Sequence, residues 1–216
     1  MLDYNRTAPE CEQNNRSAER FALLLRPDKV LAGTGEYLAI LRDVSASGLR
    51  LRLFHPLPGD PRMVIELANG DRYEASKVWE RDGQAGFEFT APVDVARLIE
   101  EQNRFRKRQV RVLVDLPARI FANGEASEAV IRDLSQQGGR IETGAQLALD
   151  QRIRIEAQGL PPIDAKVRWR RAPHAGLIFE QTFKLDELAR LVATLQPLQR
   201  GVQGLSDDPF TRIRQA

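Results

Sequence analysis

The feature that most constrains this chain is an internal repeat with an offset of 90 residues, which relates Asp43 to Asp133. The segment RDVSASGLRL at residues 42–51 returns as RDLSQQGGRI at residues 132–141. Identical residues stay in register toward the end of each copy, at Asp60/Asp150, Glu66/Glu156, Trp79/Trp169, Gly86/Gly176 and Phe89/Phe179. Solenoid units are shorter, about 20–50 residues. The sequence therefore predicts two tandem copies of one globular domain.

Within each copy the local patterns are mostly those of β-strands. Short segments such as LRLRLF and RMVIEL alternate or cluster apolar residues, and Asn69-Gly70 and Asn123-Gly124 are typical of tight hairpin turns. Amphipathic segments near 93–102 and 185–196 predict one short helix at the end of each copy. We therefore expect an all-β dominated chain of small closed barrels, because closure removes exposed strand edges.

The domain boundaries follow from the repeat and from composition. We expect a first domain at 20–103 and a second at 104–197. Residues 1–19 and 198–216 are polar with scattered glycine, so we expect a mobile N-terminal arm and a mobile C-terminal tail.

Composition excludes several classes of protein. No run of about 18 apolar residues is present, so no membrane-spanning helix is predicted. The first residues lack the apolar core of a secretory signal, and we expect a cytoplasmic protein. Cys11 is the single cysteine, and His55 and His174 fall at non-matching positions of the repeat, so we predict neither a disulfide nor a metal site. No serine–histidine pairing or catalytic carboxylate pair stands out, and we do not expect an enzyme.

The segment RFRKRQVR at residues 104–111 carries five basic residues and no acidic one. Three interpretations fit such a run: part of a ligand site, a solvated surface between domains, or a contact to nucleic acid. A formal net charge of only +2 and an aromatic content of 6% count against nucleic acid. Steeply salt-dependent affinity for DNA or RNA would be its signature.

The basic run, the motif Asp133-x-Ser135-x-x-Gly138 and the closing Trp169, Gly176 and Phe179 together resemble the PilZ domain family. Its pattern is RxxxR followed by D/NxSxxG on a six-stranded antiparallel barrel. The resemblance spans nearly the whole chain and implies two tandem six-stranded antiparallel PilZ-like β-barrels, each followed by a short α-helix. One departure is Lys107, where the pattern has the first arginine of the pair; lysine keeps the charge and loses the planar fork.

The resemblance also implies a ligand, the bacterial second messenger cyclic di-GMP, and no cofactor or metal. The implied binding residues are Arg106, Lys107, Arg108, Arg111, Asp133, Ser135 and Gly138. Arginine suits such a ligand because its guanidinium pairs with phosphate oxygens, reads the O6/N7 edge of guanine and stacks on its face. An aspartate can accept from guanine N–H groups, a serine offers a hydroxyl, and a glycine permits a tight turn and close approach.

The two copies differ at the basic positions. Arg111 corresponds to Phe21 and Lys107 to Ser17, so the first copy keeps Asp43, Ser45 and Gly48 without the arginines. In that copy we expect the motif only to brace a turn, and we expect the domain to act as an interaction module. Trp79 and Trp169 are expected to pack in the barrel cores.

These observations predict a cyclic di-GMP receptor whose ligand changes the arrangement of the domains and thereby regulates an unidentified protein partner. The alternative is a ligand-independent PilZ-like adaptor that binds its partner through the first copy. A titration with nucleotide distinguishes the two.

Overall fold

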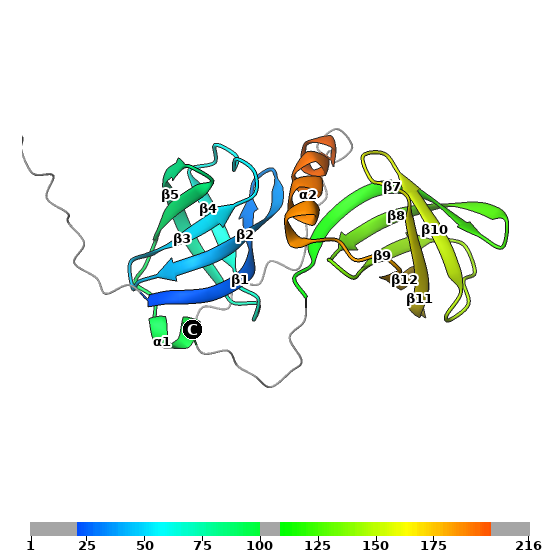
Figure 1. The fold of residues 1–216 in the computed structure, drawn as a ribbon, viewed down its shortest axis with the longest axis horizontal. Coiled ribbons are helices and arrows are strands. Elements are labelled where there is room, and N and C mark those ends of the chain that lie inside the picture. Colours follow the sequence, from blue (N-terminus) through cyan, green and yellow to red (C-terminus); the bar gives the residue numbers. More distant parts are fainter. Residues whose placement is uncertain (1–20, 100–108, 200–216) are drawn as a thin grey trace, which may run out of the picture.

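The chain forms two β-barrels, one after the other, with a helix between them (Figure 1). The structure is a computed structural model, and it describes residues 21–99 and 109–199. The expected mobile arm at 1–19 and the basic residues Arg106, Lys107 and Arg108 lie outside the described residues. So do residues 200–216 of the expected mobile tail, whereas residues 198 and 199 belong to a helix.

The first barrel consists of six antiparallel strands in the closed order β1-β2-β3-β6-β5-β4. Closure is completed where β4 pairs with β1 and Ile65 lies opposite Val30. Every strand of a closed barrel has a neighbour on both sides, which leaves no long unpaired edge. The strands are β1 (Phe21–Ala32), β2 (Gly35–Val44), β3 (Gly48–Leu53), β4 (Arg62–Glu66), β5 (Arg72–Arg81) and β6 (Gln84–Phe89).

The second barrel repeats this topology strand for strand, in the closed order β10-β11-β12-β9-β8-β7. Here β10 closes onto β7, with Ile155 opposite Ile120. Two six-stranded antiparallel barrels were predicted, and that prediction is confirmed. The strands are β7 (Val112–Ala122), β8 (Glu125–Leu134), β9 (Gly138–Thr143), β10 (Arg152–Ala157), β11 (Ile163–Arg171) and β12 (His174–Phe179).

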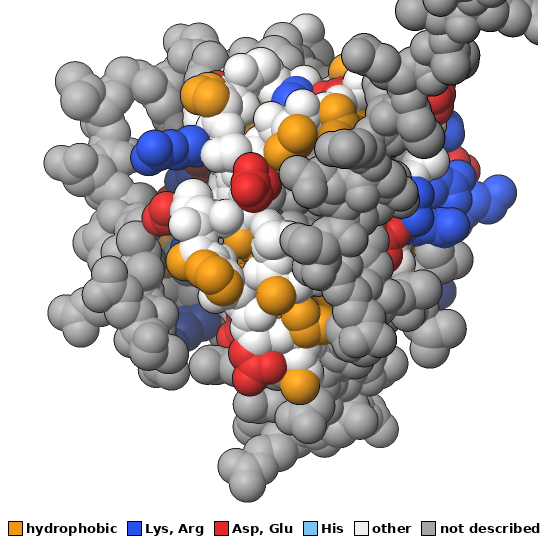
Figure 2. All heavy atoms as spheres, turned by 90° about the vertical axis from the view of Figure 1, so that its left-hand side faces the viewer, with side chains coloured by type: hydrophobic (Ala, Val, Ile, Leu, Met, Phe, Trp, Pro, Cys, Tyr) orange, Lys and Arg blue, Asp and Glu red, His pale blue; other side chains and the backbone are white. Residues whose placement is uncertain are grey.

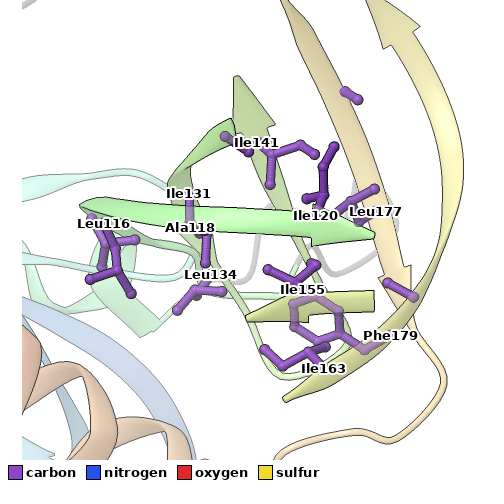
Figure 3. Close-up of a cluster of buried hydrophobic side chains, with 14 of the residues drawn as sticks. Leu116, Ala118, Ile120, Ile131, Leu134, Ile141, Ile155, Ile163, Leu177 and Phe179 are labelled. Carbon is purple, nitrogen blue, oxygen red and sulfur yellow. The ribbon is translucent and has the colours of Figure 1, made fainter. Parts of the chain in front are cut away.

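Alternation along the strands fills each barrel with apolar side chains. On β7, every second residue from Val112 to Ile120 is buried, because successive side chains of a strand point to opposite faces. Figure 3 shows Ile120, Ile131, Ile141 and Leu177 reaching the same interior from different strands. Burial of each such side chain contributes about 1.5–3 kcal/mol.

The predicted hairpin turns are present, with one difference in backbone geometry. Asn123 and Gly124 both have positive φ, 52° and 83°, as the tightest hairpin turns require. In the other turn Gly70 has a φ of 91°, whereas Asn69 does not have positive φ. The turn that joins β4 to β5 therefore relies on the glycine alone.

Each barrel is followed by a helix, as predicted. The first, α1 (Val95–Ile99), is short, and the second, α2 (Leu185–Gln199), has 15 residues. Asp186 and Glu187 lie in the first turn of α2, where negative side chains interact favourably with the helix dipole. Figure 1 shows α2 between the two barrels.

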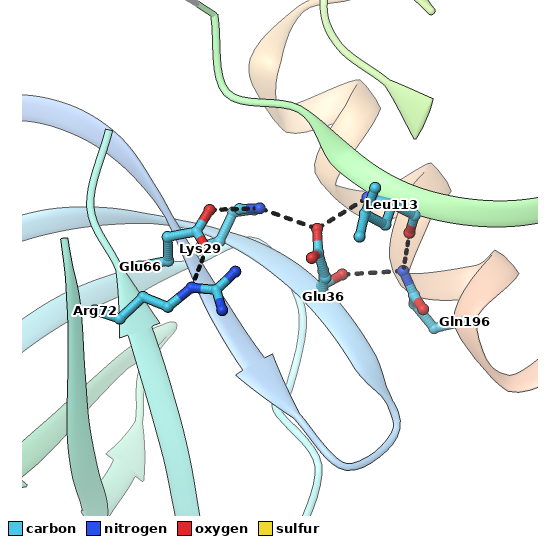
Figure 4. Close-up of polar contacts among 6 residues, drawn as sticks. All are labelled: Lys29, Glu36, Glu66, Arg72, Leu113 and Gln196. Carbon is cyan, nitrogen blue, oxygen red and sulfur yellow. Dashed lines mark hydrogen bonds and ion pairs between the residues drawn. The ribbon is translucent and has the colours of Figure 1, made fainter. Parts of the chain in front are cut away.

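The barrels are joined through α2 by both apolar packing and hydrogen bonds. Leu38 of β2 belongs to the apolar core of the second barrel, and Ala193 of α2 packs against the core of the first. The buried side chain of Gln196 donates from Nε2 to the carbonyl oxygens of Glu36, at 3.1 Å, and Leu113, at 3.4 Å. The Leu113 N–H in turn donates to Glu36 Oε2 at 2.8 Å (Figure 4).

Gly35 leaves the space that Gln196 occupies at this junction. A Cβ atom at Gly35 would lie 1.9 Å from Gln196 Oε1, and the residue has a φ of +140°. We expect Gly35→Ala to lower the free energy of unfolding by about 1–3 kcal/mol through this collision and the strained backbone. Urea unfolding of the purified variant measures the loss.

Gly124→Ala is the matched control for this substitution, since Gly124 also has positive φ, +83°, but a Cβ there would meet nothing within 4 Å. The double variant Gly35→Ala/Gln196→Ala should recover part of the loss. Equal stabilities of the Gly35 and Gly124 variants would contradict the proposed close packing.

None of the helices among residues 21–99 and 109–199 is both long enough and hydrophobic enough to cross a bilayer. On the face drawn in Figure 2, the hydrophobic side chains of the described residues form small groups separated by polar and charged atoms.

Candidate functional site

The candidate site is built around the carboxylate of Asp133, at the end of β8. The residue is 6% exposed, and each carboxylate oxygen contacts an arginine. Oδ1 lies 2.6 Å from Arg111 Nη1, and Oδ2 lies 2.9 Å from Arg140 Nε. A buried carboxylate requires such compensation, because an isolated charge in the interior is costly.

An irregularity in the strand register brings these three residues together. The pairing of β8 with β9 shifts between Ile131 and Asp133, and Asp133 lies opposite Arg140. On the other side of β8, Asp133 pairs with Leu113, two residues after Arg111. Bulges of this kind redirect side chains and occur often at functional sites.

The first barrel has the same irregularity. Its register shifts between Leu41 and Asp43, and Asp43 lies opposite Arg50. Arg50 Nε donates to Asp43 Oδ2 at 2.6 Å. The aspartate–arginine pair is therefore part of the repeated scaffold. Arg111 is added to that scaffold in the second barrel.

Ser135 and Gly138 brace the turn between β8 and β9. The backbone N–H of Ser135 and its Oγ both donate to the Gly138 carbonyl oxygen, at 2.8 and 3.0 Å. Ser45 makes the same two bonds to Gly48, at 2.8 and 3.2 Å. The motif thus has a structural role in both copies.

Gly138 has a packing role that the sequence did not predict. Its φ is not in the left-handed region, so it does not serve to tighten the turn. A Cβ at this position would lie 2.2 Å from the backbone oxygen of Leu177 in β12. Only glycine lets β9 approach β12 this closely.

The part of the basic segment that the structure describes, residues 109–111, lies at the site. Gln109 Oε1 accepts a hydrogen bond from the Gln137 N–H at 3.2 Å, and Val110 packs against the core of the second barrel. Arg111 follows and reaches Asp133. Arg111, Asp133, Ser135 and Gly138 therefore lie together, as predicted, while Arg106, Lys107 and Arg108 lie outside the described residues.

A cavity of about 700 Å³ adjoins this cluster. Both barrels line it, although their contributions differ. The second barrel contributes motif residues, whereas the first contributes the face formed by β1, β4 and the turn after β4, and none of its own motif residues. The lining comprises Lys29, Glu66, Leu67, Ala68 and Gly70 of the first barrel, and Gln109, Val110, Arg111, Ser135, Gln137, Gly138, Arg168, Trp169, Gly176, Leu177 and Ile178.

Arg111, and not Asp133, forms the wall of this cavity. The Arg111 side chain is 51% exposed, while Asp133 is buried and is absent from the lining. Arg168 also lines the cavity and pairs with Asp150 at 3.2 Å. The geometry presents guanidinium groups to the cavity, one of them anchored from behind by a buried carboxylate.

Trp169 does not pack in the core, and that prediction was wrong. It is 43% exposed and lines the cavity. Its indole lies over Gly176, where a Cβ would come within 1.9 Å of Nε1. Because Gly176 carries no side chain, the indole packs directly against the strand beneath it, and much of the residue stays exposed. An exposed aromatic face is a surface on which a nucleobase can stack.

Arg140, Arg168 and Trp169 are residues of this site that the sequence did not predict. The signal for Arg140 was present in the repeat, because Arg50 and Arg140 match at the 90-residue offset, two residues after the motif glycine. For Trp169, no local sequence pattern distinguishes a position in the core from a position at the wall of a cavity. In the part of the chain that the structure describes, no group of three or more His, Cys, Asp or Glu residues could hold a metal ion.

Comparison with known protein families gives a match over the second barrel. Residues 102–195 match the model of the PilZ domain family, and this match does not extend over the first barrel. No curated protein matches the chain.

Twenty solved chains show some likeness to this chain, among them the following three. PlzA of Borreliella burgdorferi, in complex with c-di-GMP, is 14% identical, with 82% of this chain and 93% of that one covered and a TM-score of 0.33. YcgR of Escherichia coli, also in complex with c-di-GMP, is 16% identical, with coverages of 82% and 86% and a TM-score of 0.34. The Bacillus subtilis inhibitor of motility, MotI/DgrA, is 13% identical, with coverages of 84% and 100% and a TM-score of 0.34. At TM-scores this low, these likenesses do not bear on the function.

Proposed function

We propose that the protein is a receptor for cyclic di-GMP. The match of residues 102–195 to the model of the PilZ domain family supports this proposal. The ligand occupies the cavity between the barrels. Its binding residues are the motif set of the second barrel, namely Arg106, Lys107, Arg108, Arg111, Asp133, Ser135 and Gly138.

The observation that carries this proposal is the position of Arg111. It lies at the cavity wall, half exposed, with its guanidinium held by Asp133 at 2.6 Å. A guanidinium fixed in this way loses little conformational freedom when it binds a phosphate or the O6/N7 edge of a guanine. Trp169, on the same wall, offers a face for stacking a base.

Asp133 has two roles in this proposal. Both of its oxygens contact arginines, so it holds Arg111 and Arg140 in place. Each carboxylate oxygen has two lone pairs, so Asp133 can hold both arginines and still accept a hydrogen bond from guanine N1–H. A planar guanidinium can likewise keep its bond to the carboxylate and use its other N–H groups to bind the ligand.

The lining of the cavity supports a regulatory consequence. Since both barrels contribute to the walls, the ligand's contacts depend on how the barrels are arranged. A ligand that binds one arrangement better shifts the population toward it, and a protein partner can sense that shift. We propose that the protein acts by binding its ligand and shifting between domain arrangements. We propose no catalytic step.

Titration calorimetry with purified protein tests the proposal. Wild-type protein should bind cyclic di-GMP at one class of site. Asp133→Ala should weaken binding by about tenfold or more, because charge-assisted hydrogen bonds to this carboxylate are lost. Asp43→Ala, the matched substitution in the first barrel, should leave the affinity unchanged.

The outcomes separate the competing interpretations. Absence of binding at tens of micromolar ligand contradicts the receptor and favours the ligand-independent adaptor. Two equivalent sites, one of them lost in Asp43→Ala, contradict the assignment of the site to the second barrel alone. Circular dichroism of each variant establishes that it is folded.

A further inference from the structure

The first barrel brings a buried lysine to the cavity. Lys29 of β1 lines the cavity, is 8% exposed, and contacts two carboxylates (Figure 4). Its Nζ lies 3.2 Å from Glu36 Oε2 and 2.6 Å from Glu66 Oε1. Glu66 also accepts from Arg72 Nε at 2.7 Å. These two cations and two anions form a group that is nearly neutral, and Lys29 and Glu66 are its members at the cavity wall.

The carboxylate of Glu66 is stabilised in its ionised form. Burial acts to raise the pKa of Glu66, but hydrogen bonds and the charges of Lys29 and Arg72 outweigh it and hold the pKa below its ordinary value. Glu36 is engaged as well, because its carboxylate accepts from the Leu113 N–H and its carbonyl oxygen from Gln196. Lys29 is thus the counter-ion of a glutamate that belongs to the domain junction.

The repeat shows that this arrangement is specific to the first barrel. Lys29 corresponds to Arg119 at the 90-residue offset, and Glu36 corresponds to Ala126. Arg119 has a 61% exposed side chain, which pairs with the exposed carboxylate of Glu128 at 3.8 Å. The same strand position therefore carries a solvated cation in one copy and a buried, doubly paired one at the cavity in the other.

We propose that Lys29 is a binding residue for the phosphodiester anion of the ligand, and that Glu36 limits its contribution by sharing its charge. This inference rests on the proposed function and extends it to the first barrel. An anion entering the cavity competes with Glu36 for the ammonium group. The affinity for the ligand then depends partly on the charge balance of the first barrel's side of the cavity, which carries no motif residue.

The charge balance makes two isosteric substitutions act in opposite directions. Lys29→Gln leaves the wall with an excess negative charge and should weaken cyclic di-GMP binding by about five- to tenfold. Glu36→Gln leaves an excess positive charge and should strengthen binding by a similar factor, about five- to tenfold. Because glutamine keeps a side-chain oxygen for the Leu113 N–H and the backbone carbonyl for Gln196, the junction contacts are retained.

Calorimetry at low and high salt measures both effects, with Arg119→Gln as the control at the equivalent position of the second barrel. Affinity gained in Glu36→Gln should shrink as salt rises, since the added attraction is electrostatic. If Lys29→Gln does not fold, the gain in Glu36→Gln remains diagnostic. Thermal unfolding reports the fold of each variant.

The outcomes are distinct from those that test the receptor itself. Wild-type protein that binds with both variants unchanged, or with both weakened alike, overturns the role of Lys29 and leaves the receptor standing. Wild-type protein that does not bind at all overturns both. A gain in one variant and a loss in the other, absent from Arg119→Gln, supports the inference.

Discussion

Replacement of Arg111 by alanine is expected to weaken cyclic di-GMP binding by about tenfold to a hundredfold, since a bidentate arginine–guanine contact contributes about 1–3 kcal/mol. Arg111 lies at the cavity wall and is the one motif arginine that the described residues include. Its removal also leaves Asp133 Oδ1 without this partner at a buried position. Titration calorimetry measures the loss.

Two further variants separate the charge of Arg111 from its shape. Arg111→Lys keeps the charge and removes the planar fork, so we expect an affinity between those of the wild-type and alanine proteins. Arg152→Ala removes an equal charge at an exposed residue that pairs with Glu180 away from the cavity, and it should bind normally. If Arg152→Ala lost as much affinity as Arg111→Ala, net charge and not a specific contact would account for binding.

Substitution of Gly138 by alanine is expected to destabilise the second barrel by about 1–3 kcal/mol or more, as overpacking in a close-packed interior does. The new Cβ would lie 2.2 Å from the Leu177 carbonyl oxygen and 3.5 Å from Ile178 Cα. Those atoms belong to the backbone of β12, which pairs with β9 at Gly138, so the two strands have to separate. Urea or thermal unfolding of the variant measures the effect.

Gly144→Ala is the control for this prediction, because a Cβ at Gly144 would meet nothing within 4 Å and the residue is not in the left-handed region. We expect its stability to match that of the wild-type protein within about 0.5 kcal/mol. An unchanged stability of Gly138→Ala would show that β9 and β12 are not this close. A loss of binding in that variant would follow from the opened turn, since Ser135 bonds to the Gly138 carbonyl oxygen.

Several features of this protein follow from the sequence by itself, because they depend on local chemistry. Alternation such as that from Val112 to Ile120 fixes which face of a strand is buried, and Asn123-Gly124 supplies the backbone angles of its turn. Because the sequence is repeated, the same strands and turns are expected in both copies. The spacing between the basic residues and the aspartate of the motif also predicted that Arg111 lies near Asp133, and the two side chains are in contact.

Only the tertiary structure decided how the two copies meet. The cavity combines Lys29 with Arg111, and the junction joins Glu36 to Leu113 and Gln196. These residues are far apart in the chain, and strand periodicity carries no information about which outer face of one barrel lies against the other. That choice depends on the packing of α2 between the barrels, where a side chain such as Gln196 fits only because Gly35 has none.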